Sequence, residues 1–205
     1  MMDAFEQLAV WYLRLNGYFV IPNFIAHGNG GPRTDVDVLA VRFPHSREYQ
    51  DDTQRLKIPA DKIDIIFAES KTGHCQLNGP WKAPGNGHAL EYVLRRIGIV
   101  ENDESIVAAA NGLYEKQSYQ SGDYVFRIVC FGSRINKKLP RVTQVMWPDV
   151  LAFLNERFGT YKAEKAEHQH WDSFGAYLWD NLSGDVVPNV NAIVDGWKAK
   201  CRCWP

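Results

Sequence analysis

The sequence predicts an α/β protein, with a mixed central sheet flanked by helices and a helical C-terminal extension. Residues 34–42 and 63–71 form two runs that are apolar on both faces, as in strands covered on both sides. Segments with helical periodicity stand before, between and after the strands, which is typical of a sheet covered by helices. From about residue 164 the composition turns polar, while one apolar helix face persists. We therefore expect an α/β domain over residues 1–163 and a helical extension over 164–205, packed on the same domain.

The composition is that of an ordinary globular protein. The 205 residues are 45% hydrophobic and 23% charged, which argues against a disordered chain. With 23 Lys and Arg against 24 Asp and Glu, the net charge of −1 creates no global positive field, so binding to nucleic acid would require a local patch. No apolar stretch approaches the roughly 20 residues that span a bilayer. The start of the chain lacks a secretory signal and the four cysteines are scattered, so we expect a cytoplasmic protein without a membrane partner.

The first elements are a helix and a strand. Residues 3–16 have apolar side chains at helical spacing, and Asn16 and Gly17 provide the C-terminal stop because glycine readily adopts the left-handed conformation. An apolar and aromatic run over 18–25 predicts a strand, and the glycine-rich stretch 27–32 predicts a turn or loop.

The central strands and the later elements follow in order. We predict strands at 34–42 and 63–71, separated by a polar loop insertion at 44–62. Pro148 suits the first position of a helix. The remaining predicted elements are a loop-rich stretch at 73–87, helices at 88–97 and 103–117, strands at 124–131 and 142–147, a helix at 149–158, a helix carrying Trp171, Phe174, Leu178, Trp179 and Leu182, and a last helix from Pro188.

Acidic residues lie at the ends of the two central strands. Side chains in a strand alternate between faces, so Asp35 and Asp37 share a face, as do Glu69 and Lys71. If the strands are neighbours, Asp37, Glu69 and Lys71 converge at one end of the sheet. Two carboxylates held together favour a hard divalent cation with oxygen ligands. A lysine beside them can orient water, stabilise a transition state, or act as a base if its pKa is lowered. This is the residue set for metal-assisted phosphodiester hydrolysis.

Asp37, followed after a loop by Glu69-Ser70-Lys71, resembles the D…(D/E)-x-K signature of the restriction-endonuclease-like, or PD-(D/E)xK, nuclease superfamily. The expected context also resembles that of the family: a first helix, a hairpin with the Asp on its second strand, E-x-K on the third strand, then a helix and a fourth strand. The similarity covers roughly residues 3–131. Val36 stands where the family name has proline, a departure that is common in this superfamily.

The resemblance implies a Mg²⁺- or Mn²⁺-dependent nuclease acting on DNA, with a restriction-endonuclease-like core. Asp37 and Glu69 would hold the metal and Lys71 would assist the attacking water. A homodimer is a further expectation from the resemblance, because many enzymes of this fold dimerise to cut two strands. Two alternatives stay open, a non-catalytic binding or assembly module on the same fold and a nuclease acting on RNA.

Two further acids have two interpretations each. Glu6 lies beside the apolar stripe of the first helix, where many families of this superfamily carry a metal-proximal glutamate, but a solvated carboxylate favoured by the helix dipole explains it equally well. Asp35 either helps to hold the metal or ends its strand in water.

Several basic residues are candidates for contacts with phosphate groups. The alternative is that they are solvated loop residues without such a role. These candidates are Arg33, Lys137, Lys138 and Arg141. His74 and Gln76 follow the E-x-K strand and are more simply explained as exposed loop residues. His168, His170, Cys201 and Cys203 do not have the spacing of a common zinc site, so we do not expect zinc.

Overall fold

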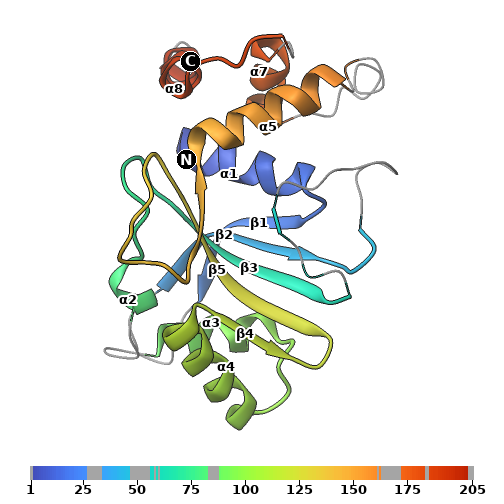
Figure 1. Ribbon diagram of the computed structural model, residues 1–205, viewed down its shortest axis with the longest axis vertical. Coiled ribbons are helices and arrows are strands. Elements are labelled where there is room, and N and C mark those ends of the chain that lie inside the picture. The colour runs from blue at the N-terminus through green and yellow to red at the C-terminus, as the bar shows by residue number, and fades with distance from the viewer. Residues whose placement is uncertain are drawn as a thin grey trace.

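The computed structural model describes residues 2–26, 34–46, 56–57, 59, 61–82, 88–160, 162, 172–182 and 185–202. The chain forms a helix-covered sheet (Figure 1). Its helices are α1 (Ala4–Leu15), α2 (Gly79–Lys82), α3 (Ala89–Ile97), α4 (Asp103–Lys116), α5 (Trp147–Thr160), α7 (Ser173–Asn181) and α8 (Val190–Arg202). Its strands are β1 (Phe19–Ala26), β2 (Thr34–Arg42), β3 (Ile63–Ser70), β4 (Ser118–Ser121), β5 (Tyr124–Gly132) and β6 (Thr143–Met146).

Within the described residues the strands form one mixed sheet in the order β1-β2-β3-β5, with β4 and β6 sharing the outer edge of β5. The first three strands are antiparallel neighbours. Strand β5 runs parallel to β3, and β6 runs parallel to β5. The prediction of a mixed sheet flanked by helices is therefore confirmed. The start of β2 and the C-terminal ends of β3 and β5 lie at one end of the sheet.

Helices cover both faces of the sheet (Figure 1). Helices α1, α5, α7 and α8 pack on one face around Val38, Ile66 and Phe131. Helices α2, α3 and α4 pack on the other, around Phe67 and Phe126. The alternation of side chains along β3, with even-numbered residues in the first core and odd-numbered residues in the second, explains why this strand is apolar on both faces.

The two C-terminal helices belong to the same apolar core as α1 and α5. Phe174 and Leu178 of α7 and Trp197 of α8 are all buried in it. The rings of Phe174 and Trp197 meet edge to face, with centroids 5.1 Å apart. Within α7 and α8 the exposed side chains are mostly polar, and the apolar faces of both helices pack on the α/β core. No helix among the described residues combines the length and the apolar character that crossing a membrane would demand.

Helix α1 is held at its start by a capping box. The Asp3 carboxylate accepts a hydrogen bond from the Glu6 backbone N–H at 2.9 Å, and the Glu6 carboxylate accepts one from the Asp3 N–H at 3.0 Å. Asn16 caps the other end, and Gly17 follows with a φ of 83°, a conformation that favours glycine. The predicted span of 3–16 is confirmed to within one residue at each end.

The structure adds two short elements to the predicted order. Strand β4 has the polar sequence Ser-Tyr-Gln-Ser and gave no apolar signal. Helix α2 lies inside the stretch 73–87 that was expected to be loop-rich, and it buries Trp81. Helix α5 begins at Trp147, one residue before Pro148, and α8 begins at Val190, two residues after Pro188.

A buried ion pair lies on β3 and β5 at the opposite end of the sheet. The Arg127 guanidinium donates to both oxygens of Asp64, from Nε at 2.9 Å and from Nη2 at 2.6 Å. The Tyr18 hydroxyl also donates to Asp64, and both the carboxylate and the tyrosine are buried. Every oxygen of this carboxylate therefore has a strong partner, as expected of a structural ion pair.

Candidate active site at the ends of β2 and β3

The antiparallel register of β2 and β3 brings Asp37 and Glu69 to the same end of the sheet. Val38 lies opposite Ala68, so the next residues outward along the two strands are Asp37 and Glu69. The Asp37 carboxylate accepts a hydrogen bond from the Ser70 backbone N–H at 2.7 Å. The aspartate is thereby fixed to the residue between Glu69 and Lys71, and the D and E-x-K parts of the motif are in direct contact.

Glu69 is buried and closely paired with Lys71. Its exposed fraction is 1%, and its Oε2 lies 2.6 Å from the Lys71 ammonium nitrogen. The Asn78 side-chain amide donates to Oε1 over a long 3.5 Å. Glu69 therefore differs from the other buried carboxylate, Asp64, whose two oxygens are both held by short bonds. Its oxygens keep capacity to accept a further ligand.

Burial dominates the electrostatics of the two acids. Desolvation raises the pKa of Glu69 from its ordinary 4.5 to about 7, against the lowering effect of Lys71, and the Asp37 charge adds to the rise. Desolvation also raises the pKa of Asp37, although the Ser70 N–H and Lys71 act in the opposite direction. Two carboxylates that are costly to ionise without compensation attract a cation to the space beside them.

Lys71 is held as a cation. Burial lowers its pKa, but the short contact with Glu69 and the charges of Glu69 and Asp37 outweigh burial, so that the pKa rises overall. Its backbone is also fixed: the Lys71 N–H donates to Phe131 O at 3.0 Å, and the Trp147 indole N–H donates to Lys71 O at 2.9 Å. Lys71 is therefore placed to donate a hydrogen bond and to supply positive charge, not to accept a proton.

The raised pKa of Glu69 predicts a pH-dependent stability of the metal-free protein. Between pH 4.5 and about 7 the folded state holds a proton that the unfolded state releases, so stability present at low pH is lost as the pH rises through about 7. In EDTA we expect the free energy of unfolding to fall by roughly 2 to 3 kcal/mol across this window on account of Glu69.

Urea denaturation of the wild type and of Glu69→Gln across this pH range measures the effect. The variant should lose this part of the pH dependence, whereas Glu101→Gln, at an exposed position, should keep it. Identical pH profiles for the wild type and Glu69→Gln would contradict the assignment.

The two additional acids, Glu6 and Asp35, lie near the site but differ in burial and in hydrogen bonding. Glu6 is half-buried, and its carboxylate serves the capping box of α1. Its pKa is raised by burial, with contributions from the charges of Asp37 and Asp35, which places it within electrostatic reach of the site. Asp35 is exposed and pairs in register with Ile25 of β1, and its charge contributes to the raised pKa of Glu69.

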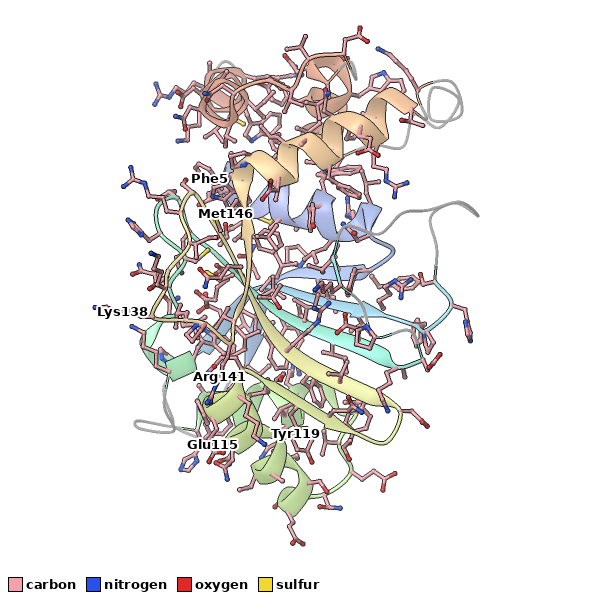
Figure 2. All side chains as sticks on the ribbon, in the orientation of Figure 1. Phe5, Glu115, Tyr119, Lys138, Arg141 and Met146 are labelled. Carbon is pink, nitrogen blue, oxygen red and sulfur yellow. The ribbon has the colours of Figure 1, made fainter. Side chains whose placement is uncertain are left out.

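The basic residues that are candidates for phosphate contacts have different surroundings in the structure. Lys137 and Lys138 are exposed on the segment between β5 and β6. Arg141 follows on the same segment but donates to the backbone carbonyl of Glu115 at 2.6 Å, so its guanidinium is directed toward α4 (Figure 2). Arg33 lies outside the described residues.

Of the residues considered for other roles, those that the structure describes lie in separate parts of the fold. His74 and Gln76 are exposed, in the loop that follows β3. Cys201 is half-buried on α8, and His168, His170 and Cys203 lie outside the described residues.

Two groups that support the site were not predicted from the sequence. Asn78 contacts Glu69 from the residue before α2, and Trp147 holds the Lys71 carbonyl from the start of α5. Both come from distant or irregular parts of the chain. The one local feature that singles out Trp147 in the sequence is its position directly before Pro148, which suits the start of a helix.

The donor set fits a hard divalent cation with few protein ligands. Across the described ranges, no group of three or more His, Cys, Asp or Glu side chains is arranged to hold a metal ion. Mg²⁺ commonly takes one or two carboxylates, keeps several waters and binds substrate phosphate. Buried Oε2 of Glu69 has the Lys71 ammonium beside it but no hydrogen bond of good geometry, which is consistent with an acceptor that a cation would complete.

Comparisons of the chain with protein-family models, with curated proteins and with solved structures gave no significant match.

Proposed function

We propose that this protein is a divalent-metal-dependent nuclease with a restriction-endonuclease-like core, and that it hydrolyses phosphodiester bonds of DNA. The observation that carries the proposal is the meeting of Asp37, Glu69 and Lys71 at one end of the sheet, with Asp37 bonded to Ser70 N–H at 2.7 Å and Lys71 2.6 Å from Glu69. These are the residues of the D…E-x-K signature. Asp37 is half-buried and Glu69 is buried, and within the described part of the chain Lys71 is the cation that lies beside them.

The order of the elements supports the resemblance on which the proposal draws. Helix α1 precedes the β1–β2 hairpin, Asp37 lies on β2, and Glu69 lies at the end of β3. Helices α3 and α4 follow, and β5 then pairs in parallel with β3. This is the succession of helix, hairpin, third strand, helix and fourth strand expected of the nuclease core.

A bound Mg²⁺ or Mn²⁺ would supply Lewis acidity for a phosphate oxygen and an activated water. Asp37 and Glu69 would hold it from adjacent strands. Lys71, as an ammonium group, would donate a hydrogen bond to the attacking water or to a phosphate oxygen and offset the negative charge that builds on the phosphate in the transition state. Water is added across one P–O bond, so that one product ends in a phosphate and the other in a hydroxyl.

Cleavage assays on plasmid and linear DNA test the proposal. Wild-type protein should cut in Mg²⁺ or Mn²⁺ and should be inactive in EDTA, and RNA of matched sequence should be cut more slowly. Cleavage that survives EDTA would reject the metal mechanism. Faster cleavage of RNA would reassign the substrate. A protein that binds metal but cuts neither nucleic acid would favour a binding or assembly module.

A further inference from the structure

The segment after β5 is fastened to the loop that follows Lys71. We call residues 133–139 the basic loop. The Ser133 N–H donates to Gly73 O at 2.7 Å, and its hydroxyl donates to Thr72 O at 2.5 Å. The Cys75 N–H donates to Arg134 O at 2.9 Å. The ribbon shows the two loops side by side, beyond the ends of β3 and β5 (Figure 1).

The contact between the loops is close enough to exclude a side chain at Gly132. A Cβ atom there would lie 2.8 Å from the Cys75 sulfur and 2.9 Å from the Cys75 nitrogen, both too near for a normal contact. The basic loop is therefore anchored at its root, directly beside the candidate active site.

The basic loop is also rigid within itself. The Asn136 N–H donates to Gln144 Oε1 at 2.7 Å, and the Gln144 amide donates to the carbonyls of Asn136 at 3.0 Å and Leu139 at 2.9 Å. The Asn136 side chain accepts from Lys138 N–H at 3.0 Å and donates to Cys75 O at 2.9 Å. A loop fixed in this way has little conformational entropy to lose when it binds a partner.

This rigid loop presents an unusual combination of side chains to solvent. Arg134, Lys137 and Lys138 are exposed, and no acidic side chain in the described part of the chain forms an ion pair with them. Between them stands Ile135, with an exposed fraction of 63%. Lys138 projects outward, away from the sheet (Figure 2). Ile135 belongs to neither apolar core of the described structure.

The basic loop also complements the charge of the site. Asp35, Asp37 and Glu69 make the end of the sheet acidic, with Lys71 as the cation in contact with Glu69. A polyanion approaching this end would be repelled without positive charge nearby. Cys75, which bonds to Arg134, is four residues after Lys71, so the root of the loop lies within about 13 Å of Lys71, or roughly four nucleotides along a strand.

We infer that the basic loop is a duplex-DNA contact, in which Arg134, Lys137 and Lys138 bind backbone phosphates and Ile135 inserts into the minor groove against the base edges. This inference rests on the proposed nuclease function for its choice of partner. Aliphatic wedges flanked by Arg and Lys are characteristic of minor-groove contacts that partly unstack a base step. Single-strand binding surfaces instead use aromatic rings, and the basic loop has none.

Binding of a fluorescein-labelled DNA duplex tests the Ile135 contact independently of cleavage. It is measured by fluorescence anisotropy in EDTA over a range of salt concentrations. Ile135→Ser should weaken binding by about tenfold, because it removes apolar area that is buried on the DNA, and it should leave the salt dependence unchanged. Val186→Ser, an exposed valine before α8 and away from the basic loop, is the matched control and should bind as the wild type does.

The phosphate contacts have a different signature. The double variant Lys137→Gln/Lys138→Gln should reduce the slope of log Kd against log salt concentration by about 2, because each phosphate contact contributes roughly 0.9 to the slope. Lys198→Gln/Lys200→Gln on α8 is the matched control and should keep the wild-type slope.

Unchanged affinity in Ile135→Ser, or an unchanged slope in the lysine double variant, would overturn the inference, as would the absence of duplex binding by the wild type. Tighter binding of single-stranded DNA or of RNA with the same residue dependence would also overturn it. Binding with the expected dependence in a protein that cuts nothing would uphold the inference while the proposed catalytic function fails.

Discussion

Replacing Lys71 with alanine is expected to reduce the turnover number for DNA cleavage by about 10²- to 10⁴-fold while leaving DNA affinity within a few-fold of the wild type. The ammonium group lies 2.6 Å from Glu69 and is held as a cation. In the proposed mechanism it therefore acts on charge that develops in the transition state. Removing such a group lowers kcat more than it weakens binding. Single-turnover cleavage in Mg²⁺ and anisotropy in EDTA measure the two quantities separately.

The control for Lys71→Ala addresses its effect on folding. The variant leaves Glu69 buried without its cation, which destabilises the metal-free protein. Thermal unfolding in Mg²⁺ should still give a cooperative transition, because the metal compensates the carboxylate. Lys198→Ala on α8 should retain full turnover. A folded Lys71→Ala protein with wild-type turnover would contradict the assigned role.

Neutralising either of the two proposed metal ligands is expected to abolish activity and, for Glu69, to stabilise the metal-free fold. Asp37→Asn and Glu69→Gln should each lower turnover by at least about 10³-fold, because each removes a ligand charge. Each should also abolish the rise in melting temperature that Mg²⁺ gives the wild type by mass action. In EDTA at neutral pH, Glu69→Gln should melt higher than the wild type, since an amide is less costly to bury than a carboxylate.

Differential scanning fluorimetry with and without Mg²⁺ measures both effects in one experiment. Glu91→Gln, in which a partly exposed α3 carboxylate loses its contact with His88, is the matched control and should keep the Mg²⁺-dependent rise. A rise that persists in both Asp37→Asn and Glu69→Gln would place the metal elsewhere.

The central strands were predictable because their signal is local. Thr34–Arg42 and Ile63–Ser70 are β-branched, apolar runs, and the structure matches their predicted ends to within one residue. Because Asp37 lies near the start of one run and Glu69 near the end of the other, an antiparallel pairing alone brings the two acids together. The contact between Lys71 and Glu69 follows from their i, i+2 spacing on one face.

The remaining features depend on contacts between distant parts of the chain. The four polar residues of β4 form a strand because they pair with the start of β5, not because of their own sequence. The loop after Lys71 is joined to Ser133 and Arg134 by two backbone–backbone hydrogen bonds, which any residue could form, and by one bond from the Ser133 hydroxyl. Asp64 and Arg127 interrupt apolar strands, and only the parallel register of β3 and β5 shows that they neutralise each other.

The interpretation of Glu6 shows the limit of a sequence pattern. The same residue fits a helix-start position and a metal-proximal position. The structure shows the capping box with Asp3, while burial, with smaller contributions from the charges of Asp37 and Asp35, raises the pKa of Glu6. Comparing Mg²⁺ affinity between Glu6→Gln and the wild type would separate the two roles, since capping is retained in part by the amide.

The central claim is that Asp37 and Glu69 together hold a divalent cation beside Lys71. A crystal of the wild-type protein soaked in Mn²⁺, with anomalous difference maps recorded at the manganese edge, measures this directly. The account predicts one strong peak within coordination distance of a carboxylate oxygen from each acid, at the end of β2 and β3. A fully soaked crystal with no peak there, or with its peak bound by other residues, would contradict it.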